Sequence, residues 1–195
     1  MNTLITFPNF GKTFFFVENE NFSLRVYAVA KEHPYTADGI PRDVSQRAEF
    51  YLTAPLCDKN YTLSFYVNGE EYGGEFSFDN VKSEYYFFCT ADLSAIQSIR
   101  CIIGDGETQS EVNALSVLTG EELSARDILN HVQTENAELF ISLTDQYGFA
   151  GEIYIRLIHE ENNYYYLGII ERTGKIHAFL LNASTGKILA KRETN

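Results

Sequence analysis

The chain has 195 residues, of which 45% are apolar, and a formal net charge of −12 from 15 basic and 27 acidic residues. This length suits one large domain or two small ones, and the apolar content suffices for packed cores, which excludes an intrinsically disordered chain. Acidic residues outnumber basic ones in both halves, and no basic stripe interrupts them. Because phosphate binding needs clustered Lys and Arg, we expect no nucleic-acid partner.

The N-terminal segment MNTLITFPNFGKTFFFVENE does not have the pattern of a signal peptide. It lacks a basic leader, and Pro8, Asn9 and Gly11 break its apolar run. No stretch approaches the roughly 20 apolar residues that span a bilayer. We therefore expect a soluble protein without a membrane span, cytoplasmic as the chain stands, or exported if a leader has been removed from it.

Residues 1–117 show the alternation of short β-strands. In YTLSFYVNGEEY the apolar side chains at 61, 63, 65 and 67 share one face, and Asn68-Gly69 then supplies a tight hairpin turn. Similar segments recur at the spacing of a β-sandwich, at 22–30, 47–54, 73–80, 84–91, 98–106 and 110–117. This region resembles an immunoglobulin-like or fibronectin-like sandwich. It lacks a Cys–Trp–Cys signature, which leaves the exact topology open.

Three segments lie between these strands. Residues 31–46 hold Pro and Gly with little alternation, which indicates a long loop, either functional or simply mobile. In TADLSAIQ, Asp92 is placed to cap one helical turn that carries Leu93 and Ile96 inward. GDGETQSE, at 104–111, has too few alternate ligands for an EF-hand loop, and we predict a hairpin turn there.

The pattern changes at SVLTGEELSARDILNHVQ, which predicts a helix. Thr119 and Glu122 have the spacing of a capping box. The apolar residues that follow recur at helical spacing, at Ala125, Ile128, Leu129 and Val132. We therefore place a domain boundary near residue 118, with a β-sandwich over 1–117 and a second domain over 118–195. Residues 137–145 fit a helix or a strand equally well.

After the helix, strands are predicted at 151–158, 163–171, 175–182 and 187–192, with turn residues between them. One helix and an antiparallel meander make a small α+β domain. The predicted fold class is therefore mainly β, an N-terminal immunoglobulin-like β-sandwich followed by a small α+β domain in which one helix packs on an antiparallel sheet.

The sequence ERTGKIHAFLLNASTGKILAKRE contains Thr-Gly-Lys-Ile twice, at 173–176 and 185–188. With the preceding helix and strands, the run from Leu180 to Leu189 resembles the closing pattern of a PepSY-type domain: an apolar strand, a short turn ending in Thr-Gly-Lys, and an apolar pair. The family usually has Asp where this chain has Asn182. The resemblance implies a non-catalytic module, found mostly in exported or membrane-attached proteins and connected with holding or inhibiting proteases. The missing leader departs from that setting.

Neither Thr-Gly-Lys is a phosphate-binding loop. A Walker loop needs Gly, four residues, then Gly-Lys-Ser/Thr, and both copies fail at the first Gly and after the Lys. We predict two hairpin turns that bracket one strand. The four His include no metal-binding spacing, and Cys57, Cys89 and Cys101 form no CxxC pair. We therefore predict no catalytic residues, no metal and no cofactor.

Both faces of the C-terminal strands are apolar. A single helix covers one face, so we expect the other to be covered by the sandwich or by a second copy of the chain. The candidate partner-binding residues are Tyr154, Tyr164, Tyr166, His177 and Phe179. For His177, a packed or half-exposed ring is expected rather than a metal ligand.

The predicted function is a non-enzymatic protein-binding or scaffold protein that binds another protein or itself. Two alternatives stay open at this stage. One is a carbohydrate-binding sandwich. The other is a hydrolase that uses Cys57, or a cleft His with carboxylates, since such catalytic partners can be distant in the sequence.

Overall fold

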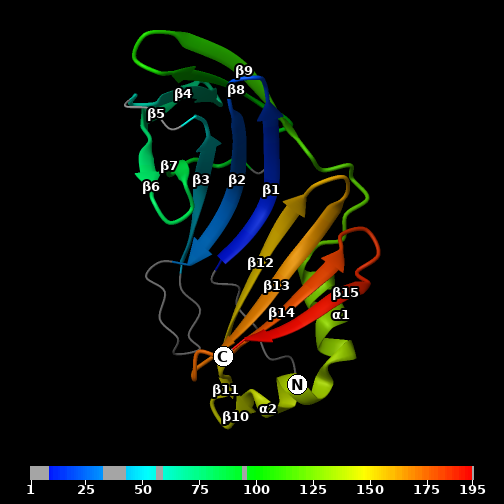
Figure 1. The fold of residues 1–195 in the computed structure, drawn as a ribbon. Helices are drawn as coiled ribbons and strands as arrows, with labels where there is room; N and C mark the ends of the chain where they lie inside the picture. Colours follow the sequence, from blue (N-terminus) through cyan, green and yellow to red (C-terminus); the bar gives the residue numbers. More distant parts are fainter. Residues whose placement is uncertain (1–8, 33–42, 56–58, 94–95, 195) are drawn as a thin grey trace. The chain divides into compact units, whose positions relative to one another are not determined.

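The structure, a computed structural model, describes residues 9–32, 43–55, 59–93 and 96–194, with the side chains of 9–13 and 31–32 left out (Figure 1). The structure is 58% strand and 10% helix, which confirms a mainly β fold. By contacts the chain forms two compact units. The helix-containing unit comprises Met1–Gly11, Ala30–Ser45 and Leu118–Asn195, and the all-strand unit comprises Lys12–Val29 and Gln46–Val117.

The all-strand unit is built from nine strands, of which β1, β2 and β3 also contribute residues to the other unit. One hydrogen-bonded path runs β1-β2-β3-β7-β6; in another, β9 pairs with β8, β8 with β4 and β4 with β5, while β9 also pairs with β1. The strands are β1 (Asn9–Glu18), β2 (Ser23–Glu32), β3 (Val44–Thr53), β4 (Thr62–Val67), β5 (Glu70–Glu75), β6 (Ser77–Asp79), β7 (Glu84–Cys89), β8 (Ser98–Gly104) and β9 (Gln109–Ser116).

The predicted alternation builds the core of this unit. Phe50 of β3 and Phe65 of β4 are fully buried, with ring centroids 4.6 Å apart, so the two paths share one core. The predicted hairpin after β4 is confirmed, since Asn68 and Gly69 both have a positive φ, at 53° and 85°. The hairpin at 104–111 is confirmed as well, because β8 and β9 pair through Gly104 and Gln109.

Two predictions for this region need qualification. The predicted loop at 31–46 is shorter at both ends, because β2 continues to Glu32 and β3 begins at Val44; residues 33–42 lie outside the described residues. Leu93 is fully buried and Ile96 packs against the core, as predicted. Ser94 and Ala95, where the helical turn was predicted, are also outside the described part of the chain.

In the helix-containing unit, α1 (Ala125–Glu135) buries the four predicted apolar residues, but its predicted cap is wrong. The cap is Ser124, whose hydroxyl accepts a hydrogen bond from the Asp127 amide at 3.2 Å. Thr119 and Glu122 do bond to each other, the Thr119 amide donating to the carboxylate at 3.0 Å, yet they close a turn before the helix. The reason is Gly120, whose φ of 89° lies outside the helical region.

The rest of this unit is a short helix and an antiparallel sheet. Residues 137–145 form α2 (Ala137–Ser142) and then β10 (Thr144–Asp145), which pairs with β11 (Gly148–Phe149). The sheet order is β15-β14-β13-β12, and Asn9 and Phe10 of β1 pair in parallel with β12. Gly174 and Gly186 take positive φ values, which confirms the two turns around β14. Figure 1 shows α1 behind the sheet. The strands are β12 (Gly151–His159), β13 (Asn163–Glu171), β14 (Ile176–Asn182) and β15 (Ile188–Thr194).

Candidate functional site

The sheet β12–β15 has two chemically distinct faces, fixed by the antiparallel register. We call one the helix-covered face; its side chains are Ile153, Ile155, Leu157, Tyr165, Leu167, Ile169, His177, Phe179 and Leu181, and all are buried. We call the other the tyrosine face; its side chains include Tyr154, Arg156, Ile158, Tyr164, Tyr166, Ile170, Ile176, Ala178, Leu180 and Arg192, of which only Arg192 is well exposed and the others are half-buried.

The helix-covered face packs under α1. Ile128 and Val132 of α1 are fully buried, and the chain entering the helix is tied to the sheet. The Tyr165 hydroxyl donates to the Leu123 carbonyl at 3.0 Å, and burial raises the pKa of this tyrosine to about 12. The side-chain carboxamide of Asn163 donates from Nδ2 to Glu122 Oε1 at 2.5 Å. This face is structural.

Two of the five predicted binding residues, His177 and Phe179, lie on this covered face. Both are about 95% buried. His177 Nε2 is 2.6 Å from Glu171 Oε1, and Nδ1 is 3.2 Å from Glu193 Oε1. The hydrogen bond with His177 lowers the pKa of Glu171, while Lys175, which bonds Glu193 at 2.7 Å, lowers the pKa of Glu193. His177 is thus a packed ring, as expected, in a cluster whose carboxylates fix its orientation.

The other three predicted residues, Tyr154, Tyr164 and Tyr166, come together on the tyrosine face. The rings of Tyr154 and Tyr166 have centroids 5.5 Å apart, and the Tyr154 hydroxyl donates to that of Tyr166 at 3.2 Å. Tyr154 lies over Gly168, where a Cβ would come within 2.3 Å of the ring. Burial raises the pKa of Tyr154, which therefore stays a neutral hydrogen-bonding group at physiological pH.

Two arginines stand on the outer strands of this face, Arg156 on β12 and Arg192 on β15. Within the described part of the chain, neither guanidinium forms an ion pair or hydrogen bond. Three strand spacings separate them across the sheet, and Arg192 lies in the row of Tyr154, two residues along from Arg156, so their backbones are roughly 16 Å apart. Glu152, opposite Ile170 in the register, lies on the same face, which therefore carries two arginines and one carboxylate. An aromatic face whose two arginines have no ion pair in the described structure, on a chain of net charge −12, is the feature of the sheet that packing alone does not explain.

The thiols do not form a catalytic site in the described structure. Burial raises the pKa of Cys89 to about 11 and that of Cys101 to about 12, so neither is a thiolate at neutral pH. Neither makes a hydrogen bond to a His among the described residues. Cys57, on which the hydrolase alternative rested, lies outside these residues.

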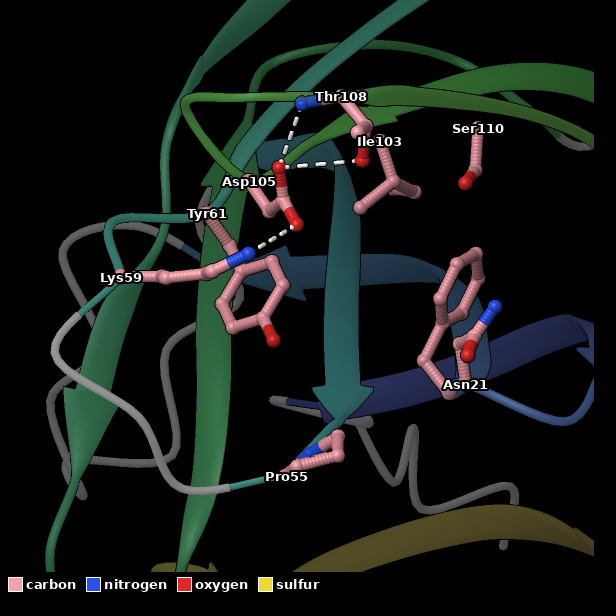
Figure 2. A pocket seen from close by; sticks show the side chains of 9 residues that line it. Asn21, Pro55, Lys59, Tyr61, Ile103, Asp105, Thr108 and Ser110 are labelled. Carbon is pink, nitrogen blue, oxygen red and sulfur yellow. Dashed lines mark hydrogen bonds and ion pairs between the residues drawn. The ribbon is translucent and has the colours of Figure 1, made fainter.

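The all-strand unit contains a pocket of about 360 Å³. Figure 2 shows Tyr61 and Asn21 on opposite sides of it, with Ile103 above and Pro55 below in this view. The side chains come from the two residues before β2, the residue Pro55 after β3, the entry to β4, and the β8–β9 hairpin. The full lining is Asn21, Phe22, Pro55, Lys59, Tyr61, Ile103, Asp105, Thr108 and Ser110.

The charged groups of the pocket are paired with one another. Lys59 Nζ donates to Asp105 Oδ2 at 2.8 Å and to Glu107 Oε2 at 3.1 Å. Asp105 Oδ1 accepts from the Thr108 and Glu107 amides at 2.7 and 3.0 Å. The hydrogen bond from Lys59 lowers the pKa of Asp105 and, in turn, the carboxylates raise the pKa of Lys59. These bonds fix the Lys59 side chain against the loop at 104–108.

Sequence reasoning missed this pocket, because Lys59 and Asp105 are 46 residues apart and no local pattern joins them. The described residues contain no group of three His, Cys, Asp or Glu side chains placed to hold a metal ion. Among the same residues, neither α1 nor α2 is long and apolar enough to span a membrane. Comparisons with protein-family models, with curated proteins and with solved structures give no match.

Proposed function

We propose that this chain is a non-enzymatic binding protein that engages another protein through the tyrosine face. The arrangement that we propose around this face is an immunoglobulin-like sandwich over residues 1–117 and a PepSY-like domain over 118–195. The observation that carries the proposal is the pair of arginines without an ion pair in the described structure, which flank three half-buried tyrosines. Tyr and Arg are the residue types enriched at the centres of protein interfaces.

The chemistry of the face specifies its partner. Tyr154, Tyr166 and Leu180 form an apolar and aromatic centre, and Arg156 and Arg192 stand on opposite sides of it. A guanidinium binds carboxylate in a bidentate geometry. Because the arginines are roughly 16 Å apart, an extended segment bridges them with carboxylates about five residues apart. The proposed partner therefore presents acidic residues around an apolar segment.

A display library of random peptides tests this proposal on the full chain. We expect the selected peptides to be enriched in Asp and Glu flanking apolar residues. Their affinity should fall at least tenfold when Arg156→Glu and Arg192→Glu are combined, because each attraction becomes a repulsion. The matched control is Arg126→Glu, an exposed arginine on α1 that is unpaired among the described residues. Selected peptides without acidic bias, or an equal loss in the control, would contradict the proposal.

Sedimentation of the free chain shows whether the partner is a different protein or a second copy of this chain. A monomer at micromolar concentration supports a different protein as the occupant of the tyrosine face. A dimer that dissociates in the double arginine variant would instead assign the face to a second copy of the chain, and would overturn the proposal in its present form.

A further inference from the structure

We infer that the pocket of the all-strand unit binds an uncharged polyhydroxylated ligand, a single sugar ring that is either free or at the end of a glycan. The pocket lies in a different unit from the tyrosine face, and the inference does not depend on the proposed protein partner. It rests on the size of the pocket, the division of its lining into apolar and polar sides, and the pairing of its charges.

The size and the apolar side suit one small ring. A pocket of about 360 Å³ is at the lower end of the range of ligand sites. Phe22, Tyr61, Ile103 and Pro55 supply carbon surface, and Figure 2 shows the Tyr61 ring and Ile103 facing the same space. The C–H face of a sugar ring packs against such surface, while its hydroxyls need polar groups around the edge.

The polar side supplies both donors and acceptors. The Asn21 carboxamide and the Ser110 hydroxyl line the pocket, and neither side chain has a hydrogen-bond partner among the described residues. A carboxamide offers two donors and one acceptor oxygen, and a hydroxyl offers both roles. A sugar hydroxyl also donates and accepts, so it matches this combination better than a group that only accepts or only donates.

The charges of the pocket argue for an uncharged ligand. Lys59 is bound by the Asp105 and Glu107 carboxylates, so its ammonium group is not available to an anion. Glu107, the second carboxylate bound to Lys59, lies outside the pocket lining, and its side chain is 77% exposed and screened by water. Phosphate and carboxylate ligands would meet the Asp105 carboxylate at this wall, and a cation would have to displace Lys59.

Amide NMR shifts of the full chain test the inference with the methyl glycosides of glucose, galactose and mannose. We expect at least one to give saturable shifts at Thr108 and Ser110, in the millimolar range typical of a small neutral ligand. Losing one hydrogen bond should weaken binding about fivefold in Asn21→Ala and in Ser110→Ala. Ser110→Leu should abolish binding by filling the pocket.

The control variant is Asn113→Ala, which alters an exposed residue of β9 that points away from the core. It should bind as the parent does. Glucosamine and glucuronic acid test the charge argument, and either binding more tightly than every neutral glycoside would overturn the inference. So would the absence of saturable shifts at about 50 mM of all three glycosides, or undiminished binding in Ser110→Leu.

The same measurement distinguishes the two sources of the sugar. If an oligosaccharide ending in the preferred sugar binds more tightly than its methyl glycoside, the ligand is the end of a glycan. Equal affinity assigns the pocket to a free sugar. Both outcomes support a sugar site, and neither depends on the arginine variants of the tyrosine face.

Discussion

The two faces of the β12–β15 sheet are made by the same four strands, yet they differ in burial and in the pairing of their polar groups. Leu167 and Tyr166 are neighbours in β13, and the first is fully buried while the second is half-buried. On the helix-covered face, polar groups are paired, as His177 is with Glu171. On the tyrosine face Arg156 and Arg192 make no ion pair within the described residues.

This difference shows that apolar content alone does not decide which face of a sheet is the core. Both faces carry large apolar side chains, as the sequence predicts. The covered face is the one whose side chains meet α1 and whose polar groups find partners inside the unit. On the tyrosine face the two arginines have no ion pair among the described residues and the tyrosine hydroxyls of Tyr154 and Tyr166 bond only to each other, so these groups can still bind a partner, which is why we assign binding to this face.

The largest expected effect separates the faces by stability. Leu167→Ala removes a fully buried side chain and should lower the free energy of unfolding by about 3 kcal/mol. Tyr166→Ala, at the adjacent half-buried position, should cost about 1 kcal/mol and should weaken peptide binding instead. Chemical denaturation of both variants, together with peptide affinity, checks this. Similar losses of stability at the two positions would show that the tyrosine face is as much a core as the other.

Much of this architecture can be predicted from the sequence, and the failures have physical causes. Alternation places Tyr164 and Tyr166 opposite Tyr165, and helical spacing identifies the buried side of α1. Neither pattern shows which face of the sheet the helix covers. The prediction therefore grouped His177 and Phe179 with the tyrosines, although they lie on the other face.

Two further failures concern features that local patterns cannot resolve. Thr119 and Glu122 do form the bonds of a capping pair, but Gly120 holds the chain in a turn and the helix begins later. The pairing of Lys59 with Asp105 depends on chain segments far apart in the sequence, and only the folded structure brings them together.

The second prediction compares the tolerance of the faces to added volume. Ala125→Leu enlarges a buried residue of α1 and should cost about 2 kcal/mol, because a packed interior cannot give way. Gly168→Ala places a Cβ against the Tyr154 ring, but that ring is the movable end of a side chain, so the cost should be about 0.5 kcal/mol. Thermal or chemical unfolding measures both.

A double-mutant cycle provides the control for this comparison. In the Tyr154→Ala background, Gly168→Ala should no longer cost stability, because the ring that it displaces is gone. A cost at Gly168 that persists without Tyr154 would show that the backbone of β13, rather than the ring, resists the added carbon.

The third prediction concerns hydroxyl groups on the two faces. Tyr165→Phe removes the hydrogen bond to the Leu123 carbonyl and should cost about 1 kcal/mol. Tyr164→Phe, next to it on the tyrosine face, removes a hydroxyl with no partner among the described residues and should change stability by about zero. The denaturant midpoints of the two variants measure these changes in stability. Equal changes would show that the Tyr165 hydroxyl does not stabilise the chain segment that enters α1.

The smallest expected effect is a change in the pH dependence of stability. Burial raises the pKa of Glu122, but hydrogen bonds from Thr119 and Asn163 outweigh it and hold this pKa at about 2. A folded-state pKa below the unfolded value of 4.5 stabilises the fold above pH 4.5, and this contribution is lost as the pH falls toward 2. Glu122→Gln should therefore be less stable than the parent at pH 7, and the difference should shrink on acidification.

The stability of the variant is subtracted from that of the parent at each pH, because Asp105, Glu171 and Glu193 also have lowered pKa values and contribute to the pH dependence of both proteins. Glu121→Gln, an exposed neighbour without a side-chain bond in the described structure, should follow the parent at every pH. If the Glu122→Gln difference stays constant between pH 7 and about pH 3, the carboxylate charge does not hold the chain against the sheet. Apolar packing alone would then hold α1 against the helix-covered face.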